Sequence, residues 1–315
     1  MSDHNCIAIY FLQKPFTANT EQMGCYYFNI LEAVELCRSL NASIVPPQLP
    51  LCPRDNKKVE LNSTDHWYSS ILAIGSIDST KVIDYTNIKT ITVSEFHNQS
   101  NGTVKMNNES LTISGLNFLK DDNSKYWIVD LPKRWDIQGR DPHIFYSSLY
   151  QLLPLKTSIL DSRIPEWYKN NCKKSFLGVH WRRGDRGNSI LGQIGKHLWA
   201  STEPRLVGKY INNYISKNPD IEWVYVSTNS GSAIDRKILS ETVIKPLYYF
   251  DTPFEIPALE RWKWDISDLL MCAKAKHLLL SPGGLTNSSA FGRLIYAECL
   301  RQNPDDALVN FIPFV

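Results

Sequence analysis

Two adjacent arginines, Arg182 and Arg183, are the side chains of this sequence best suited to binding a charged ligand. They follow an apolar run, Ser175 to His180, that is typical of a buried strand. Successive side chains of an extended chain point to opposite faces, so we expect one arginine to face a cleft and the other to face the protein or solvent. A guanidinium binds phosphate oxygens through two parallel hydrogen bonds. The pair predicts either a diphosphate site or a structural pairing of Arg183 with Asp185.

A glycine-containing loop, Ser281 to Phe291, follows a predicted strand, His277 to Leu280, and leads into a helix that begins near Phe291. Glycines allow the backbone to approach a ligand closely. Ser288 and Ser289 lie at the predicted helix start, where N–H groups and the helix dipole favour anions. The loop lacks the Gly-Lys-Ser sequence of a Walker P-loop. It predicts a phosphate cradle, and an ordinary capped turn is the alternative.

Two carboxylates complete the set of groups that could do chemistry. Asp268 lies in a predicted helix, Asp265 to Lys276, and could accept the N–H donors of a guanine edge or simply interact with the helix dipole. Glu21 lies three residues before Gly24, in a loop between the first predicted strand and helix. It could act as the base on an acceptor hydroxyl, or be an ordinary solvated carboxylate.

No metal or cofactor site is predicted. The adjacent pairs Asp121-Asp122 and Asp305-Asp306 stand in polar surroundings that are typical of solvated loops, not of a strand end that holds a metal-bound diphosphate. The seven cysteines contain no CxxC pair, which argues against a zinc site and predicts buried free thiols. The arginines would then supply the positive charge that a metal supplies elsewhere.

The elements that must position these groups alternate between strand and helix in both halves of the chain. The expected strands and helices of the first half are Ile7–Leu12, Tyr26–Leu40, Ala42–Val45, Ile71–Ile77, Lys81–Tyr85 and Tyr126–Leu131. Those of the second half, besides the segments named above, are Pro204–Ser216, Glu222–Val226 and a helix that begins near Ala233. This alternation favours parallel sheets covered on both faces, with ligands beyond the carboxyl ends of the strands. We expect two α/β domains, 1–173 and 174–315, with a cleft between them.

The composition excludes several classes of protein. The formal net charge of +2 over 315 residues gives no indication of a nucleic-acid partner. No run of about 18 uncharged apolar residues predicts a transmembrane helix, and the first twelve residues do not resemble a signal peptide. The expected location is the cytoplasm, with the lumen of the endoplasmic reticulum or Golgi as the alternative if a targeting segment precedes this sequence.

Three blocks of the sequence, in this order, resemble the GDP-fucose O-fucosyltransferase family with its plant and microbial relatives. The first block contains Gly24 and the run Leu36–Pro47. The second, Gly178–Asp185, contains His-Trp-Arg-Arg and is similar to the H-x-R-R signature of the family. The third combines Asp268–Ala275 with Asn287–Phe291. Together the blocks span most of the chain.

This resemblance implies a GT-B architecture of two Rossmann-like domains facing a central cleft, the first on the acceptor side and the second binding the nucleotide sugar. It also implies inverting transfer of fucose from GDP-fucose to an acceptor hydroxyl on a glycan or protein, without a metal. Related transferases that use rhamnose donors share the same blocks. Another nucleotide sugar, such as a rhamnose or xylose donor, therefore stays open, as does a non-catalytic carbohydrate-binding protein.

Residue by residue, the resemblance implies Arg182 on the phosphates, His180 and Asp268 around guanine, and Ser288 and Ser289 at the diphosphate. The candidate catalytic residues are Arg182 and Glu21. The candidate donor-binding residues are Gly24, His180, Arg182, Arg183, Asp268, Thr286, Ser288, Ser289 and Phe291.

Overall fold

In the computed structural model of the 315-residue chain, the described residues are 6–8, 27, 31, 89–91, 126–129, 144, 147–148, 150–151, 153–183, 192–253, 256, 258–282, 289–305 and 307–313. The predicted strands Ala42–Val45, Ile71–Ile77 and Lys81–Tyr85 lie outside these residues. Within the described part of the chain, no helix combines the length and the apolar character needed to cross a lipid bilayer.

The chain divides into two compact units, Met1–Leu155 and Lys156–Val315. Residues 156–173, which were expected to close the first domain, form the short helices α5 (Ser158–Asp161) and α6 (Glu166–Asn171) of the second unit. They belong there because α5 packs on helix α10, and because Trp167 of α6 stacks on Tyr248 with ring centroids 4.8 Å apart.

The first unit contains a parallel sheet of three short strands in the order β1-β3-β2. The strands are β1 (Cys6–Ala8), β2 (Lys89–Ile91) and β3 (Tyr126–Val129). The sequence predicted β1 and β3 as strands but not β2. Tyr27 and Leu31, one helical turn apart, are both helical and buried, as the predicted helix Tyr26–Leu40 requires. Parallel strands need crossover connections, so this unit has the expected α/β character.

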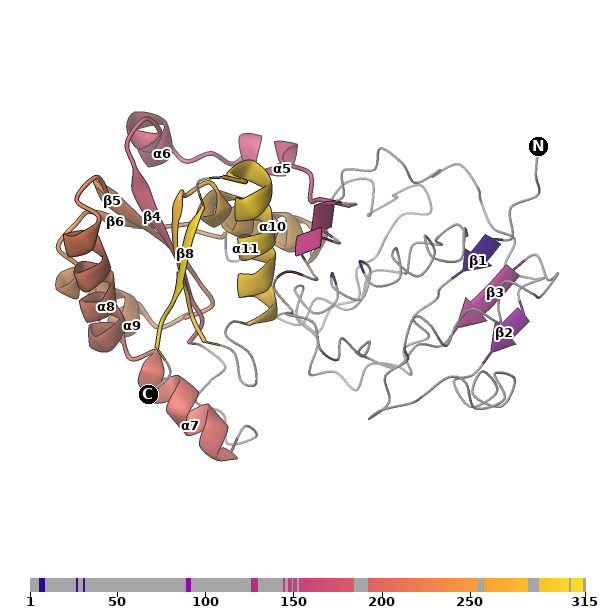
Figure 1. The fold of residues 1–315 in the computed structure, drawn as a ribbon, viewed down its shortest axis with the longest axis horizontal. Helices are drawn as coiled ribbons and strands as arrows, with labels where there is room; N and C mark the ends of the chain where they lie inside the picture. The colour runs from indigo at the N-terminus through magenta and orange to yellow at the C-terminus, as the bar shows by residue number, and fades with distance from the viewer. Residues whose placement is uncertain are drawn as a thin grey trace. The chain divides into compact units, whose positions relative to one another are not determined.

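The second unit is built on five parallel strands in the order β6-β5-β4-β7-β8 (Figure 1). The strands are β4 (Phe176–Trp181), β5 (Trp223–Thr228), β6 (Leu247–Tyr249), β7 (His277–Leu280) and β8 (Leu308–Phe311). The longer helices are α7 (Gly192–Ser201), α8 (Pro204–Lys217), α9 (Ala233–Thr242), α10 (Ala258–Ala273) and α11 (Ala290–Gln302). The predicted α/β class with a parallel sheet is therefore confirmed.

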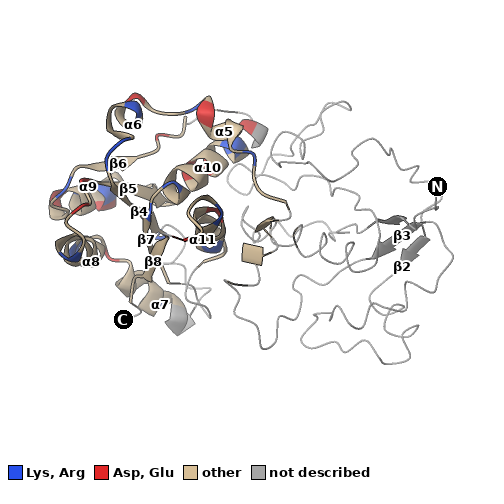
Figure 2. Cartoon of the chain, turned by 45° about the horizontal axis from the view of Figure 1, so that its top comes forward, with Lys and Arg blue, Asp and Glu red and all other residues tan. Residues whose placement is uncertain are grey.

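Charged residues of both signs are interspersed over the helices of the second unit, including α6, α9 and α10 (Figure 2). Several of them pair along one helix, as Lys237 and Glu241 do on α9, with Nζ and Oε1 3.7 Å apart. Helix α8 differs, since its charged residues, Arg205, Lys209 and Lys217, are all basic.

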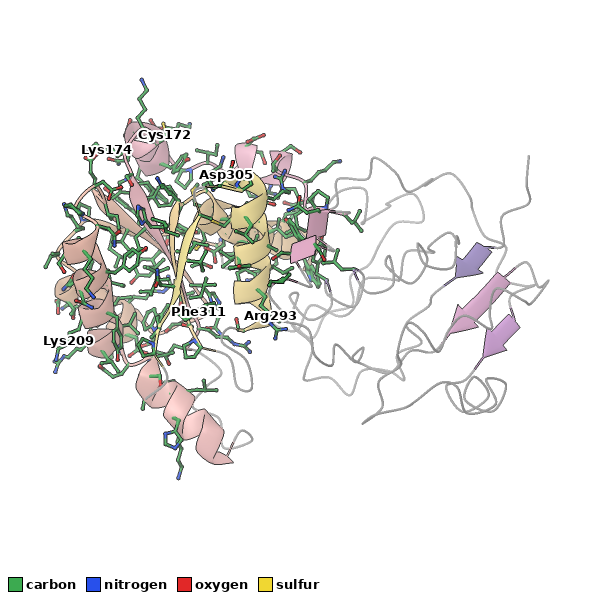
Figure 3. The ribbon with its side chains drawn as sticks, in the orientation of Figure 1. Cys172, Lys174, Lys209, Arg293, Asp305 and Phe311 are labelled. Carbon is green, nitrogen blue, oxygen red and sulfur yellow. The ribbon has the colours of Figure 1, made fainter. Side chains whose placement is uncertain are left out.

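The order of the strands defines a switch point in the second unit. From the central strand β4 the chain moves outward to β5 and β6, and it then crosses to β7 and β8 on the other side. Crevices at such reversals, beyond the carboxyl ends of the strands, are where open α/β sheets bind ligands. Arg293, in the first turn of α11, and Phe311, the last residue of β8, lie toward this end, whereas Asp305 lies toward the other (Figure 3). The start of α11 is therefore at the carboxyl end of the sheet.

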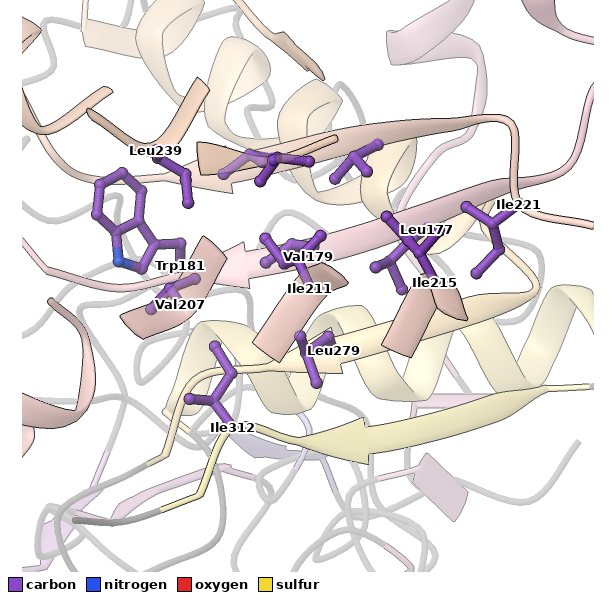
Figure 4. Packing of buried hydrophobic residues seen from close by; sticks show 13 residues of the cluster. Leu177, Val179, Trp181, Val207, Ile211, Ile215, Ile221, Leu239, Leu279 and Ile312 are labelled. Carbon is purple, nitrogen blue, oxygen red and sulfur yellow. The ribbon is translucent and has the colours of Figure 1, made fainter. Parts of the chain in front are cut away.

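The sheet is covered by helices on both faces. Leu177 and Val179 of β4 pack with Val207, Ile211 and Ile215 of α8 in an apolar cluster to which α9 also contributes (Figure 4). Full burial of each such side chain stabilises the folded state by about 1.5–3 kcal/mol relative to leaving it exposed. The opposite face carries α10 and α11.

Glycine allows α10 to approach the centre of the sheet closely. A Cβ added to Gly178 of β4 would lie 2.6 Å from the backbone oxygen of Cys272, near the end of α10. Cys272 and Cys299 are buried free thiols, and Cys172 is an exposed one, among the cysteines whose side chains are described. The prediction of buried free thiols is confirmed for Cys272 and Cys299.

Candidate functional site

The end of β4 presents His180 on the face of the sheet covered by α10 and α11. Its imidazole is buried, with 4% exposed, and its ring centroid lies 5.8 Å from that of Phe291 on α11. Leu177, Val179 and Trp181 point to the opposite face, as the alternation of a strand requires. His180 and Phe291, both predicted site residues, are thus brought together although they are distant in the sequence.

The ends of β4 and β7 are joined by hydrogen bonds through Ser281, the first residue after β7. The backbone N–H of Ser281 donates to the His180 carbonyl at 2.9 Å, and the Ser281 hydroxyl accepts from the backbone N–H of Arg182 at 3.0 Å. Ser281 is fully buried, and Arg182 is partly exposed. Arg182 and the start of the Ser281–Phe291 loop therefore lie side by side at the switch point of the sheet.

Asp268 lies on α10 and is held by hydroxyls from β5. Its Oδ2 accepts from Ser227 at 2.7 Å, and its Oδ1 accepts from the hydroxyl of the buried Tyr225. Ser227 is the register partner of His180, so the carboxylate stands beside the strand that carries the imidazole. Burial, and then the charge of Asp268, raise the pKa of Tyr225 well above its ordinary value, so the phenol stays protonated and donates.

Arg183 is directed into the protein. Its guanidinium, with the side chain 7% exposed, forms an ion pair with Asp235 on α9, with Nε 2.6 Å from Oδ2. It also donates from Nη1 to the carbonyls of Trp199 and Thr202, at 3.0 and 3.1 Å. Its Cζ lies 3.7 Å from the centroid of the Trp199 ring. One arginine of the pair therefore faces the protein, as expected, with Asp235 as its partner; Asp185, the partner considered from the sequence, lies outside the described residues.

Ser289 is the N-cap of α11. Its hydroxyl accepts from the backbone N–H of Gly292 at 3.1 Å, and its side chain is buried. The cap satisfies one of the first N–H groups of the helix, and the dipole of α11 places partial positive charge at this end. The predicted helix start near Phe291 is confirmed to within one residue, since α11 begins at Ala290. An anion-favouring helix end thus lies at the carboxyl side of β7.

Four of the predicted site residues, Glu21, Gly24, Thr286 and Ser288, lie outside the described residues, and their roles stay predictions. Among the described residues, no group of three or more His, Cys, Asp or Glu side chains is arranged to hold a metal ion.

Several residues of the site were not singled out from the sequence. Ser281, Ser227, Tyr225, Asp235 and Trp199 each hold a predicted site residue in place through the contacts given above. Position at a strand end was a usable signal for Ser227 and Ser281. The partners of Arg183 had no such signal, because α7 was not predicted as a helix and Asp235 lies 52 residues away in the sequence.

No family model matches the chain, and no curated protein matches it in sequence. Solved structures do match. POFUT1 in complex with GDP has 11% sequence identity and a TM-score of 0.58, with 99% of both chains covered. The selenomethionine form of fucosyltransferase NodZ from Bradyrhizobium has 13% identity and a TM-score of 0.54, with 93% of this chain and 91% of that chain covered.

A third match is NodZ alpha-1,6-fucosyltransferase soaked with GDP-fucose, with 13% identity and a TM-score of 0.50 over 92% of this chain and 91% of that chain. Identities this low establish shared architecture and leave activity to be argued from the site. The likeness extends over nearly the whole length of the chain. The fold of this protein is therefore an α/β fold with parallel sheets, similar to that of solved fucosyltransferases.

Proposed function

We propose that this protein is a glycosyltransferase that transfers fucose from GDP-fucose to an acceptor hydroxyl on a glycan or protein. The observation that carries the proposal is the meeting of three features at one switch point: Arg182 after β4, Ser281 after β7 and the capped start of α11. A guanidinium beside a helix N-terminus suits a diphosphate. The fold shared with POFUT1 and NodZ, over more than nine tenths of each chain, supports the same reaction class.

The guanine end of the donor would lie between His180 and Asp268. The hydroxyls of Tyr225 and Ser227 orient the Asp268 carboxylate through hydrogen bonds. An ionised carboxylate only accepts hydrogen bonds, which suits the two N–H donors of a guanine edge. Adenine presents no such pair of donors there, and this difference would select the base.

The chemistry would be a direct displacement at the anomeric carbon of fucose. The acceptor oxygen forms the new bond while the bond to the β-phosphate oxygen breaks, and GDP leaves with the electron pair. Negative charge on the departing diphosphate grows in the transition state, where Arg182 and the start of α11 would stabilise it. A single displacement inverts the anomeric centre. Glu21 is the proposed base for the acceptor proton, and no metal is needed in this scheme because the guanidinium supplies the charge.

The test is GDP binding and GDP-fucose hydrolysis, each measured with and without a chelator, for the wild type and Arg182→Ala. We expect the variant to lose about 100- to 1,000-fold in turnover, the usual effect of removing one preorganised charge-stabilising group. Arg205→Ala, which removes an exposed arginine from α8, is the matched control and should behave as the wild type. GDP affinity and turnover that survive in Arg182→Ala, or turnover that the chelator abolishes, would contradict the proposed mechanism.

A panel of nucleotide sugars in a thermal-shift assay identifies the donor, because a ligand that binds only the folded state raises the melting temperature. GDP-fucose should give the largest shift. A larger shift with a rhamnose or xylose donor would reassign the sugar. Glycan binding that persists in Arg182→Ala without any nucleotide binding by the wild type would instead indicate a carbohydrate-binding protein.

A further inference from the structure

We propose that Arg183 is a positioning residue that holds Arg182 in place from the other side of the sheet, and that it does not bind the diphosphate itself. This inference rests on the function proposed above. It assigns different tasks to two adjacent residues of the same type.

The first observation is that the guanidinium of Arg183 is already bound by other groups of the protein. It is paired with Asp235 at 2.6 Å, bonded to the carbonyls of Trp199 and Thr202, and stacked 3.7 Å from the Trp199 ring. With the side chain 7% exposed, turning it toward a ligand would break an ion pair, two hydrogen bonds and a cation–π contact together.

The second observation is that these contacts fasten the end of β4 to two helices. Asp235 lies in the first turn of α9, and its own N–H is bonded to the N-cap Ser232 at 3.1 Å. Trp199 and Thr202 lie at the end of α7, where carbonyl groups carry partial negative charge. The Thr202 carbonyl also accepts from Trp181 Nε1 at 2.9 Å. Trp181 and Arg183, two positions apart, therefore anchor the same helix end.

The third observation is that Arg182 lies between these two anchors. Its N–H is bonded to Ser281, and the N–H of Arg183 is bonded to the side-chain oxygen of Asn229 at 2.9 Å. Alternation places the Arg182 side chain on the side of His180, away from Trp181 and Arg183. With the backbone fixed on both sides of it, Arg182 has its direction set before a ligand arrives, which is what a charge-stabilising group requires.

The test measures the dissociation constants of GDP and guanosine for the wild type, Arg183→Ala, Arg183→Lys, Asp235→Asn and the double variant Arg183→Ala/Asp235→Asn. We expect the Kd of GDP to rise by about 10- to 100-fold in Arg183→Ala, because a displaced Arg182 loses its charge-assisted hydrogen bonds to the phosphates. The Kd of guanosine, which has no phosphate, should stay unchanged. Loss of folded structure alone would change both constants, so their ratio separates positioning from unfolding.

Asp235→Asn should weaken GDP binding in the same direction, although Asp235 is proposed to act only through Arg183. The double variant should be no weaker than Arg183→Ala, because the two residues act through one contact. Arg183→Lys should not restore GDP affinity, since an ammonium lacks the planar set of donors that reaches Asp235 and both carbonyls. Glu241→Gln, which removes an exposed carboxylate from the same helix, is the matched control and should bind GDP as the wild type does.

Two results would overturn the inference. Wild-type GDP affinity in Asp235→Asn, together with recovery in Arg183→Lys, would make Arg183 a direct phosphate ligand. If the fold-losses of GDP affinity in the two single variants multiply in the double variant, Arg183 and Asp235 act separately. If Arg183→Ala does not fold, Arg183→Lys and Asp235→Asn carry the same comparison. A wild type that binds GDP no better than guanosine would instead remove the proposed function, and this inference with it.

Discussion

The two faces of the second-unit sheet differ sharply in chemistry although the same strands form both. Toward α8 and α9, the strands present mainly apolar side chains, such as Leu177, Val179 and Val226, and a few polar ones such as His277, which meets Tyr214 of α8. Toward α10 and α11, the same strands present His180, Tyr225 and Ser227 near their carboxyl ends. The first face is a continuous core, whereas the second becomes polar as it approaches the switch point.

This difference shows how a buried strand can serve stability and a binding site at once. Burying a polar group is costly unless it is hydrogen-bonded, and the hydroxyls of Tyr225 and Ser227 meet this requirement through Asp268. The resulting network orients the carboxylate before any ligand is present. We therefore expect substitutions on the α8 face to change stability, and substitutions on the α10 face to change ligand selectivity.

The largest expected effect is on the α8 face. Ile211→Ala removes a fully buried side chain from the core cluster. We expect the free energy of unfolding to fall by about 2–5 kcal/mol, as for other large-to-small core changes, with the GDP affinity of the folded protein unchanged. Urea unfolding and calorimetric binding measure the two quantities. Asn213→Ala, at an exposed position of the same helix, is the control. If Ile211→Ala instead lost GDP affinity while keeping its full stability, the two faces would not have separate roles.

A smaller effect is expected on the α10 face. Tyr225→Phe removes a hydroxyl donor to Asp268. A hydrogen bond to a charged group contributes about 1.5–3 kcal/mol, so the preference for GDP over ADP should fall by about tenfold or more. Competition binding with the two nucleotides measures it. Tyr248→Phe makes the same chemical change on β6, where the ring stacks on Trp167, and should keep the preference. An unchanged preference in Tyr225→Phe would mean that Asp268 needs no orientation by β5.

The smallest expected effect lies at the opposite end of the sheet. Asp220 accepts from Ser175 at 3.1 Å and lies 3.3 Å from Nε2 of His277. Burial raises the pKa of its carboxyl slightly, but the hydrogen bond from Ser175 and the neighbouring His277 outweigh it and lower the pKa below 3.8. A carboxyl whose pKa is lower in the folded state than in the unfolded state stabilises the fold at pH values above its unfolded-state pKa. This contribution is lost as the pH falls through the folded-state pKa.

Asp220→Asn should therefore lower the melting temperature slightly at about pH 6 and by less at about pH 3, because the contribution of the carboxylate declines as the pH falls toward its lowered pKa. The side chain is 58% exposed, so solvent screening limits the effect to about 0.2–1 kcal/mol. Equal shifts at both pH values would indicate that the pairing with Ser175 matters rather than the charge. No change in GDP affinity is expected at this distance from the switch point.

The second-unit fold could be predicted largely from apolar runs and helix boundaries. β7 was predicted with its observed bounds, His277–Leu280, and α8 begins at the predicted Pro204, with Glu203 as its N-cap. β6 and β8 were not predicted; both are short edge strands whose side chains are partly exposed. α10 begins at Ala258, before the predicted Asp265, in a stretch where tryptophans and charges hide the helical period.

The sequence singled out the candidate site residues but not the side chains that hold them. His180 and Arg182 were chosen for their place at a strand end, and Asp268 for its place in a helix ahead of the glycine-containing loop; the family resemblance supported all three. The separate direction of Arg183 could not be read from adjacent residues, because its partners come from two helices that only the folded sheet brings together. The same holds for Tyr225, whose hydroxyl reaches a carboxylate 43 residues away.

The most direct measurement is a crystal structure with GDP bound. The account predicts that the diphosphate lies against the guanidinium of Arg182 and the first N–H groups of α11, with guanine between His180 and Asp268 and with Arg183 still paired to Asp235. A nucleotide bound elsewhere on the sheet, or phosphates held by Arg183 in place of Arg182, would contradict it.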